Sequence, residues 1–501
     1  LQLDDITAEA IRDPARPIVL ARKKANCFLS DLLAPGLGEL GVFLPYSPLH
    51  HRLLADYGNP IVATSGNISG EPVITDNREA QERLAGVADV FLHHNRPIVR
   101  PADDPVMRPM AGAARLIRPG RGVAPIEREL PGKLPQAILA TGGHMKNTVA
   151  LAWDNRVVVS PHVGELETPR SNAVFKQIIN DIQALYHVNS QVIACDLHPG
   201  YASSRWANQQ DLPVIRVQHH AAHASSLAGE HPDIENWLVF TWDGVGYGSD
   251  ETLWGGEALA GRPGGWDRVA SFRTFKLVGG DKAGREPWRS AAALLWAEGA
   301  DVPLNQDFAT GDGPEREALR LAHLAWKREI NTFETSAVGR LFDAAAALVL
   351  GRHAVSFEGQ GPMELEHMAF DGCEAVPLPL VNDEDGVLRS DWVQLPGVLA
   401  DKDLSTAQRA GIFHESMAQA LIDQALAVRD TQGFDAIGLS GGVFQNRRLT
   451  ESVVKMAADA GIEVRLHRDI PANDGGLCFG QVIEAAAVMS KEQQTGNNNG
   501  R

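Results

Sequence analysis

The sequence predicts an α/β protein of two domains, and three observations support this prediction. Between about residues 16 and 123, apolar runs of strand length alternate with stretches of helical pattern. Three prolines and mixed charges then follow in APIERELPGKLPQ (residues 124–136), a composition that is typical of a linker. Beyond it, apolar strands run into glycine-rich turns three times, within residues 137–153, 237–260 and 436–457.

These observations place a first domain at 1–125, a linker at 126–136 and a second domain at 137–490. The chain of 501 residues fits such a division, because domains usually hold about 100 to 200 residues. The chain starts in what reads as mid-domain sequence, so we expect the N-terminal part of the first domain to be missing. The polar, Gly- and Asn-rich end at 491–501 predicts a disordered tail.

The second domain has a distinctive order of elements. The first two strands return from their turns as further strands, whereas the third turn opens into a helix. This is the layout of the bilobal actin/Hsp70-like nucleotide fold (ASKHA), in which a duplicated core holds nucleotide phosphates. The pattern alone leaves a second interpretation open, namely three unrelated turns in a large α/β protein.

Composition excludes several classes of protein. A formal net charge of −17 disfavours a nucleic-acid track, because a negative surface repels polyanions. The four cysteines form no CxxC pair, so neither a disulfide framework nor a thiolate zinc site is indicated. No apolar run approaches the roughly 20 residues that cross a bilayer, and the N-terminus lacks a signal peptide. We therefore expect a cytoplasmic protein without membrane contact.

A possible anion site lies in IVATSGNISGEPV (residues 61–73). Its glycines let successive backbone N–H groups point into one concavity, and the side chains of Ser65, Asn67 and Ser69 add donors. Most Ser-Gly-Asn turns bind nothing, so this motif by itself favours an ordinary loop.

A possible metal site begins at VIRVQHHAAHASSLAGE, where a strand passes into an Ala-rich helix. His219 and His223 are four residues apart, so on a helix both imidazoles reach one ion. His220 points elsewhere, and it occupies the place of the catalytic Glu in HExxH, so the motif is not that of a zincin. An HxxxH pair is common in large proteins and, alone, more often binds no metal.

Two carboxylates strengthen the metal interpretation. Asp243 follows the strand WLVFTW at the second glycine-rich turn, and Asp474 lies in PANDGGLCFG before the last helix. Two imidazoles and two carboxylates suit one Zn²⁺ or Fe²⁺ ion with an open position. The alternatives are a turn residue for Asp243 and a helix cap for Asp474.

The first domain resembles a known family. The string SGNISGEP is similar to the signature of YrdC domains, and GVFLPYSPLHHRLL with RPIVRPADDPVMR is similar to the version found in the [NiFe]-hydrogenase maturation factors of the HypF family. The resemblance implies a domain that forms carbamoyl-adenylate from ATP, with Mg²⁺. It also implies that phosphate or carbamoyl oxygens are bound by Ser65, Asn67, Ser69, Arg100 and Arg118.

The second domain resembles the same family. HHAAH, TWDGVGYG, GLSGGVFQN, PANDGG, GGHMKNT and DLHPGYASS follow one another as in the C-terminal domain of HypF proteins. The resemblance implies that His219, His223, Asp243 and Asp474 are metal ligands. The nucleotide-binding residues that it implies are Gly142, Gly143, Lys146, Asn147, Gly339, Asp343, Ser440, Gly441, Gly442 and Asn446. For Gly339, packing of a buried helix is an equal alternative.

The resemblance implies a carbamoyltransferase. Carbamate derived from carbamoyl phosphate would react with ATP to carbamoyl-AMP, and the carbamoyl group would pass to the C-terminal cysteine thiol of a HypE-like partner, for synthesis of iron cyano ligands. No cysteine of this chain is needed as nucleophile, and we expect Cys478 to be a core residue.

Three other functions stay open on the sequence. A tRNA threonylcarbamoyl-adenosine modification enzyme shares both domain types, but it needs a basic RNA-facing surface. A metallopeptidase is suggested by HxxxH, although the general-base Glu is missing. A non-catalytic nucleotide-binding module with an actin-like fold is the third.

Overall fold

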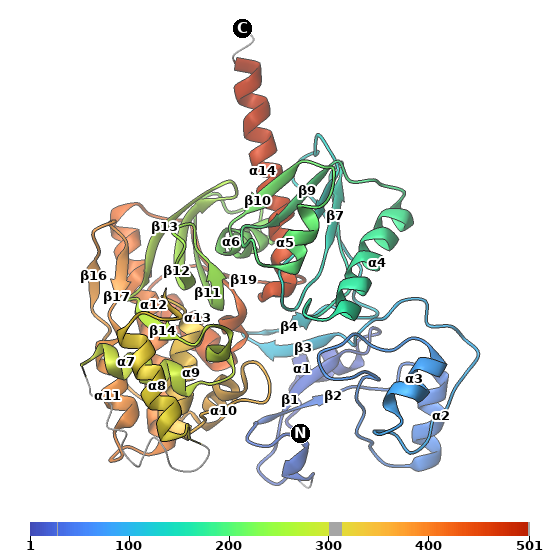
Figure 1. Ribbon diagram of the computed structural model, residues 1–501, viewed down its shortest axis with the longest axis horizontal. Coiled ribbons are helices and arrows are strands. Elements are labelled where there is room, and N and C mark those ends of the chain that lie inside the picture. Colours follow the sequence, from blue (N-terminus) through green and yellow to red (C-terminus); the bar gives the residue numbers. More distant parts are fainter. Residues whose placement is uncertain (28, 300–312, 499–501) are drawn as a thin grey trace. The chain divides into compact units, whose positions relative to one another are not determined.

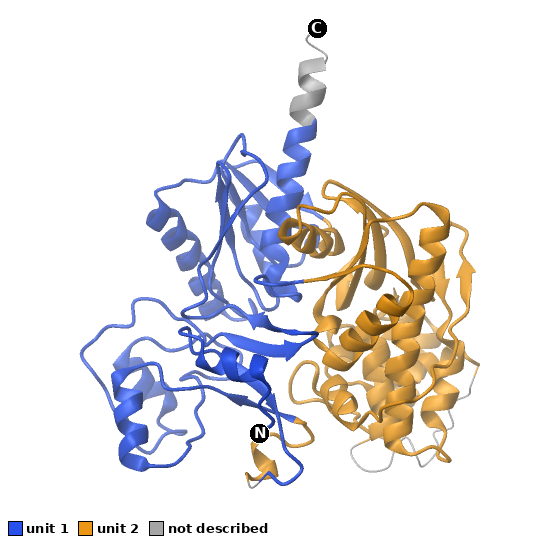
Figure 2. Ribbon diagram, turned by 180° about the vertical axis from the view of Figure 1, so that it is seen from behind, with its two compact units in different colours: residues 1–27, 39–217, 467–501 blue, residues 28–38, 218–466 orange. Residues whose placement is uncertain are grey.

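A computed structural model describes residues 1–27, 29–299 and 313–498 and divides the chain into two compact units. Unit 1 comprises Leu1–Cys27, Glu39–Val217 and His467–Arg501, and unit 2 comprises Phe28–Gly38 and Gln218–Leu466 (Figures 1 and 2). The boundary predicted at 126–136 therefore falls inside unit 1. The second predicted domain is shared between the units, because the chain leaves unit 1 after Val217 and returns to it at His467.

The first part of unit 1 is a four-stranded mixed sheet with one helix packed on it. Helix α1 (Asp5–Arg12) starts at Asp4, whose carboxylate accepts the N–H of Thr7, and it buries Ile11 against Val19. The strands, in the order β2-β1-β3-β4, are β1 (Ile18–Arg22), β2 (Glu39–Val42), β3 (Val106–Met110) and β4 (Ala113–Arg118).

Between β2 and β3 the structure has helices α2 (Pro48–Tyr57) and α3 (Asn77–Leu84) and no strand. The apolar runs PIVAT and ADVFLH alternate with helices as strands would, yet they lie outside any strand, and Val62 and Val90 are 73% and 83% exposed. A strand needs neighbours that satisfy its backbone N–H and C=O groups. None of the strands in the described residues lies beside these runs, so the expectation of strands is wrong here.

The rest of unit 1 is built on a six-stranded sheet in the order β10-β9-β6-β7-β8-β5. The predicted hairpin at 137–153 is confirmed, since Ile138 pairs antiparallel with Ala152. The strands are β5 (Ile126–Glu129), β6 (Ile138–Ala140), β7 (Ala150–Trp153), β8 (Arg156–Val159), β9 (Val192–Asp196) and β10 (Val214–Val217). Its helices are α4 (Pro169–Tyr186), α5 (Ala202–Ala207), η5 (Asp474–Gly476) and α14 (Leu477–Asn498).

Two predicted segments differ from this arrangement. The predicted linker at 126–136 starts with β5, which pairs antiparallel with β8, for example Ile126 with Val159. Helix α14 continues to Asn498, so residues 491–498 of the predicted disordered tail are helical, and 499–501 lie outside the described residues. Helix α14 buries Phe479 and Val482 in the same apolar cluster as β6 to β9, which anchors the helix before it reaches the polar end.

Unit 2 is built on a nine-stranded sheet in which seven strands follow the order β16-β17-β13-β12-β11-β18-β19, while β15 pairs with β12 and β14. The strands are β11 (Trp237–Tyr247), β12 (Leu253–Arg262), β13 (Gly265–Phe272), β14 (Phe275–Val278), β15 (Thr332–Thr335), β16 (Leu380–Asn382), β17 (Leu388–Ser390), β18 (Ala436–Ser440) and β19 (Val464–Leu466). The predicted hairpin at 237–260 is confirmed as β11–β12, and the predicted strand-turn-helix is confirmed as β18 followed by η4 and α13.

Helices cover both faces of this sheet, which explains why WLVFTW is apolar except for Thr241. Trp237 and Val239 of β11 share a cluster with Leu227 of α6, whereas Phe240 and Trp242 pack in a second cluster. The helices are α6 (His219–Glu230), α7 (Trp288–Ala297), α8 (Arg316–Lys327), α9 (Val338–Leu350), α10 (Gln360–Met368), α11 (Leu395–Ala400), α12 (Thr406–Thr431) and α13 (Arg447–Asp459), with the short turns η1 (Asp31–Leu33), η2 (Gly280–Gly284), η3 (Trp392–Gln394) and η4 (Gly442–Gln445).

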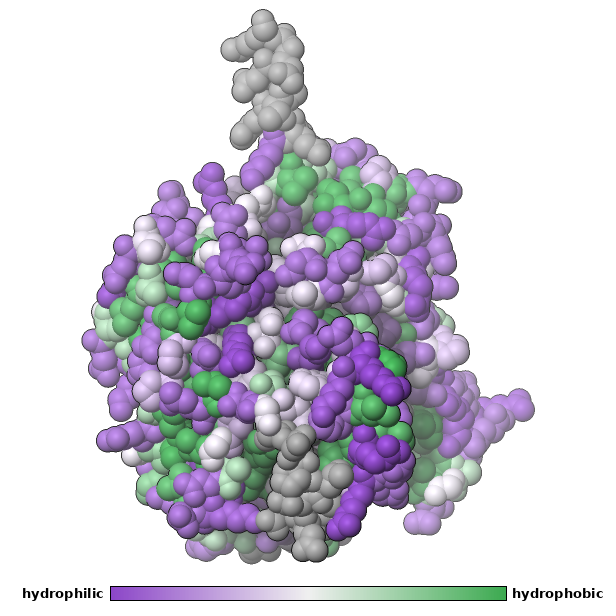
Figure 3. Space-filling model, turned by 60° about the vertical axis from the view of Figure 1, so that its left-hand side comes forward, coloured by the Kyte–Doolittle hydropathy of each residue, from purple (hydrophilic) through white to green (hydrophobic). Residues whose placement is uncertain are grey.

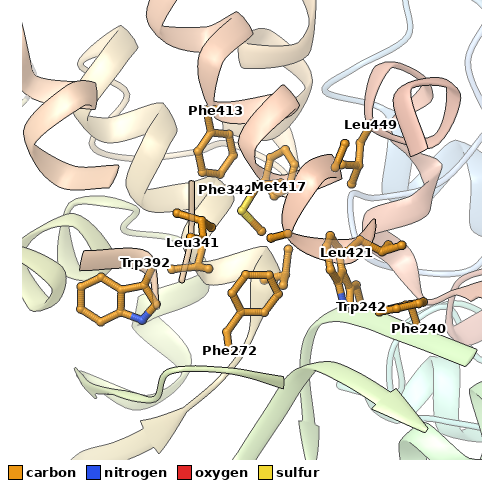
Figure 4. Packing of buried hydrophobic residues seen from close by; sticks show 14 of the residues in the cluster. Phe240, Trp242, Phe272, Leu341, Phe342, Trp392, Phe413, Met417, Leu421 and Leu449 are labelled. Atoms are coloured by element: carbon orange, nitrogen blue, oxygen red, sulfur yellow. The ribbon is translucent and has the colours of Figure 1, made fainter. Parts of the chain in front are cut away.

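The second cluster is the main core of unit 2. Figure 4 shows Phe342 of α9 and Phe413 of α12 pointing toward one another, with ring centroids 4.8 Å apart in an edge-to-face arrangement. Trp242 packs against Phe272 in the same cluster, so the strand that carries Asp243 is fixed to α9 and α12 through apolar contacts. This core therefore joins β11 to α9 through shared apolar contacts.

The surface of the protein is mixed in hydropathy. On the face that Figure 3 draws, hydrophilic residues prevail and hydrophobic ones form small patches among them. Across the described part of the chain, no helix combines the length and the hydropathy that a membrane-spanning segment requires.

Candidate metal and nucleotide site

Helix α6 brings the two predicted imidazole ligands together. It starts directly after Gln218, whose side chain accepts the N–H of Ala221 and so fixes the first turn. His219 and His223 are both buried, and their ring centroids lie 5.0 Å apart. The spacing of four residues therefore places both rings on one face of the helix, as predicted.

Asp243 completes a cluster of three donors within unit 2. It lies in β11 at a bulge where the pairing with β12 shifts register, so its side chain leaves the regular alternation of the strand. Its Oδ2 is 3.5 Å from Nε2 of His219 and 3.3 Å from Nε2 of His223. Burial alone would raise the pKa of Asp243, but the two imidazoles hold that pKa well below its ordinary value.

The donor set fits a divalent ion. Charge-assisted hydrogen bonds have donor–acceptor distances of about 2.7–2.9 Å, so these separations are long for direct pairing. Donors that each lie about 2.1 Å from one tetrahedral ion are about 3.4 Å from one another. Two imidazole nitrogens and a carboxylate oxygen, all within 4.8 Å of one another, therefore form a candidate metal-binding group for Zn²⁺ or Fe²⁺.

Asp474, the fourth predicted ligand, belongs to unit 1 and opens η5. The cap of this turn is Asn473, whose side chain accepts the N–H of Gly475, so Asp474 is not needed as a helix cap. A Cβ on Gly143 would lie 3.4 Å from Oδ2 of Asp474, which places this carboxylate beside the first glycine turn. Its role as a metal ligand stays a prediction.

The first glycine turn has the predicted backbone. Gly142 has φ +66°, and a Cβ there would lie 2.2 Å from the carbonyl oxygen of Thr148, so only glycine fits. Asn147 donates from Nδ2 to the carbonyls of Thr141 and Gly143, at 2.8 and 2.7 Å, and thereby builds the turn. Lys146 has a positive φ of 45° in the same turn.

The third glycine turn is tied to the three-donor cluster. Gly442 donates its N–H to Oδ1 of Asp243 at 3.1 Å, and Ser440 donates from Oγ to the carbonyl of His223 at 2.9 Å. Gly441 has φ +101°, and a Cβ there would lie 2.2 Å from the carbonyl oxygen of Trp242. Asn446 caps α13 by accepting the N–H of Leu449.

Helix α9 starts against the second glycine turn. A Cβ on Gly339 would lie 2.7 Å from Cα of Gly244 and 3.0 Å from the carbonyl oxygen of Asp243, so this glycine permits a close approach. One turn later, burial raises the pKa of Asp343 to about 6, although Arg340 lowers it. Arg340 is a further residue of this region, and its i,i+3 spacing to Asp343 on the helix is the sequence signal that could have indicated it.

The predicted residues of the first domain lie in a different setting. Ser65 donates to Oδ1 of Asn67, whose Nδ2 donates to the carbonyls of Ile68 and Glu71, so the turn forms as predicted. Ser65 and Ser69 are exposed. Their contact with a phosphate stays a prediction.

The two predicted arginines have protein partners. Arg100 pairs with Asp181 of α4 at 2.8 Å on the surface. Arg118 donates from Nε to the carbonyl of Asp104 at 3.0 Å. The binding roles of both residues stay predictions.

Comparison with known proteins identifies three segments. A family model described as "Carbamoyltransferase, Kae1-like Domain, second subdomain" matches residues 239–481, one described as "HypF Kae1-like domain" matches 133–230, and one described as "Telomere recombination" (Sua5/YciO/YrdC) matches 2–120. Together they follow the order of domains that the sequence predicts.

Individual proteins named HypF also match most of this chain. The chain is 38% identical over 498 residues to carbamoyltransferase HypF of Synechocystis sp., covering 96% of this chain but 64% of that protein. A carbamoyltransferase HypF homolog of Cupriavidus necator is 34% identical over 361 residues. This match covers 70% of this chain and 91% of that protein. A crystal structure of full-length HypF in a phosphate- and nucleotide-bound form superposes with a TM-score of 0.92 at 35% identity, covering 97% of this chain and 77% of that chain.

Proposed function

Because this chain belongs to the HypF family of carbamoyltransferases, we propose that it is an ATP-dependent carbamoyltransferase of [NiFe]-hydrogenase maturation. The chain spans 64% of the Synechocystis relative, so the reaction of the whole protein is part of this proposal. The observation that carries it is the cluster of the buried His219 and His223 with the partly buried Asp243, which the third glycine turn holds through Gly442.

In the proposed reaction, a carboxylate oxygen of carbamate, which derives from carbamoyl phosphate, attacks the α-phosphorus of Mg·ATP at the SGN turn of the first domain. The new O–P bond gives carbamoyl-AMP, and pyrophosphate leaves with the electron pair of the broken P–O bond. Ser65, Asn67, Ser69, Arg100 and Arg118 would bind its oxygens, because hydroxyl, amide and guanidinium donors suit phosphate and carbamoyl groups. Adenylation is needed since carbamate is a poor acyl donor.

The second step transfers the carbamoyl group to a cysteine thiolate at the C-terminus of a HypE-like protein. The S–C bond forms, the C–O bond to phosphate breaks, and AMP leaves with the electron pair. His219, His223, Asp243 and Asp474 would hold a Zn²⁺ or Fe²⁺ ion, which supplies positive charge to the phosphate. The backbone N–H groups at the glycine turns would bind the same negative charge.

The poor nucleophilicity of the two buried cysteines of this chain, Cys195 and Cys478, supports a thiol that is supplied by the partner. Burial raises the pKa of Cys195 to about 11 and that of Cys478 to about 12. At neutral pH both are therefore thiols rather than thiolates.

The test incubates the full chain with carbamoyl phosphate, or carbamate, ATP, Mg²⁺ and a HypE-like acceptor, and measures a carbamoyl mass increment on the acceptor. His219→Ala is expected to lower bound metal and transfer at least about tenfold while ATP–pyrophosphate exchange at the first domain persists. His187→Asn, at the exposed C-cap of α4, is the matched control that leaves all three unchanged. Loss of exchange together with transfer would contradict two separate centres.

Each alternative function has its own outcome in this assay. A carbamoyl group on tRNA adenosine instead of on the acceptor, with salt-dependent tRNA binding, would favour a tRNA-modifying enzyme. Peptide cleavage that a chelator abolishes would favour a metallopeptidase. Nucleotide binding without turnover would favour a binding module.

A further inference from the structure

Arg340 and Asp343 form an incompletely satisfied ion pair within unit 2. Nη1 of Arg340 lies 2.9 Å from Oδ2 of Asp343, and the two side chains are only 15% and 7% exposed. Apart from this ion pair, the guanidinium makes no hydrogen bond to any described residue, and Oδ2 of Asp343 receives none. A guanidinium has five N–H donors, and buried polar groups are normally hydrogen-bonded.

Other arginines of the same unit differ from Arg340. Arg352 makes a two-point contact with Glu364, at 2.8 and 3.0 Å, and Arg409 donates to the carbonyl of Leu399 at 2.8 Å. Arg268 donates to the buried carboxylate of Glu257 at 2.6 Å. The Nε of Arg409 also lacks a partner, but both Nη atoms of Arg409 donate to backbone carbonyls. In Arg340 both Nε and Nη2 are without a hydrogen bond to the described residues, which points to a partner other than a protein side chain.

The position of Arg340 identifies the kind of partner. A Cβ on Gly244 would lie 3.7 Å from its Nη2, and a Cβ on Gly284 would lie 3.3 Å from its Nη1. Gly244 directly follows Asp243, so the guanidinium stands at the second glycine turn beside the candidate metal group. A fixed planar cation at such a turn matches the oxygens of a phosphate.

We infer that Arg340 binds a phosphate oxygen of the nucleotide at the second glycine turn and that Asp343 positions its guanidinium. This inference rests on the proposed function, because it names the residue that receives the charge of the leaving AMP. When the acceptor thiolate, whose proton has passed to solvent, forms the S–C bond, the C–O electron pair moves onto the phosphate. Arg340 keeps its own proton and stabilises that charge electrostatically.

The experiment measures nucleotide binding in unit 2 separately from the first domain. The full chain is photolabelled with 8-azido-ATP, and label is counted only on peptides from residues 218–466. Arg340→Met is expected to lower this labelling at least about tenfold, and Arg340→Lys by less, since lysine keeps the charge but loses the two-point geometry. Arg320→Met, which removes an exposed ion pair with Glu317, is the matched control and should label as the wild type does.

Two further measurements separate binding from folding. Metal content and ATP–pyrophosphate exchange should stay at the wild-type level in both Arg340 variants, because Arg340 is not one of the proposed metal ligands and does not belong to the first domain. Wild-type labelling in Arg340→Met, or loss of metal with the label, would overturn the inference. Normal labelling of the wild type without carbamoyl transfer would instead refute the proposed function, and the loss of label in Arg340→Met would still support phosphate binding.

Discussion

Asp243 and Gly442 are joined by a hydrogen bond that links the third glycine turn to the candidate metal group. The N–H of Gly442 donates to Oδ1 of Asp243 at 3.1 Å, while Oδ2 of the same carboxylate lies 3.3 Å from Nε2 of His223. One oxygen is therefore held by the backbone, and the other is directed toward the imidazoles. A change in the turn should alter metal binding although no ligand is replaced.

Gly442→Ala tests this link. A Cβ at residue 442 would lie 2.8 Å from Oδ1 of Asp243, which is too close, so we expect the carboxylate to move away from the imidazoles. Metal affinity should fall about 10-fold to 100-fold, as it does when other supporting contacts of metal ligands are lost. Metal content after dialysis against a graded chelator measures the change.

Gly397→Ala is the matched control for this substitution. Gly397 lies in α11, and a Cβ there would meet no atom within 4 Å. We expect unchanged metal content and slightly higher stability, since alanine is favoured over glycine in a helix. Equal metal affinity in both variants would mean that the contact with Gly442 does not position Asp243.

The sequence predicts well those features that depend on local spacing. The strand-turn units at β6, β11 and β18 were predictable because apolar runs and glycines lie within about twenty residues of one another. The pairing of His219 with His223 follows from helical periodicity alone. The position of Asp243 at the end of an apolar strand made it a candidate ligand, and the family resemblance added support, but local spacing could not show that it approaches the two imidazoles.

Features that depend on distant partners were missed. The sequence predicts a linker where β5 lies, because the partner strand β8 lies some thirty residues further along the chain. The turn at Gly142 is closed by Gln481, 339 residues away, and nothing near Gln481 signals this contact. Arg340 escaped notice because its unused donors are a property of its surroundings, which sequence patterns do not contain.

Asp343 makes the stability of unit 2 depend on pH. Burial raises its pKa from 3.8 to about 6, with Arg340 acting in the opposite direction and Glu358 adding to the rise. Between about pH 4 and pH 6 the folded protein keeps the proton on Asp343, whereas the unfolded chain has released it. The free energy of unfolding therefore falls as the pH rises from about 4 to about 6. Relative to Asp343→Asn, the wild type should lose unfolding free energy on the order of 3 kcal/mol between pH 4 and pH 8.

This prediction concerns the slope of the unfolding free energy against pH, and not the constant difference in stability between the two proteins. Removing the carboxylate also leaves Arg340 without its ion pair, but that cost belongs to the variant at every pH.

Asp383→Asn is a control of opposite sign. Burial alone would raise the pKa of Asp383, yet the N–H of Val387 and the guanidinium of Arg389 lower it, so its contribution is present above its ordinary pKa. Thermal unfolding at a series of pH values measures both slopes, and parallel curves for wild type and Asp343→Asn would refute the first.

Thiol reactivity tests whether the acceptor is external. Cys195 and Cys478 are fully buried, and burial raises the pKa of each to about 11 and about 12, whereas Cys27 and Cys373 are half-buried. In the folded chain at pH 7.5, iodoacetamide should modify Cys27 and Cys373 and spare the other two, while all four should react in denaturant. Peptide mass spectrometry gives the extent of each reaction.

Cys478→Ala extends the test to transfer. Cys478 contacts the hydroxyl of Thr148 at 3.1 Å in the core of unit 1, so its replacement should lower stability by about 1–2 kcal/mol through a small cavity. If the carbamoyl group goes directly to a partner thiolate, the variant still forms the carbamoylated acceptor at the wild-type rate once it is folded. Fast alkylation of Cys478 in the native chain, or a folded Cys478→Ala variant that binds metal yet does not transfer, would place a covalent intermediate on this residue and contradict direct transfer.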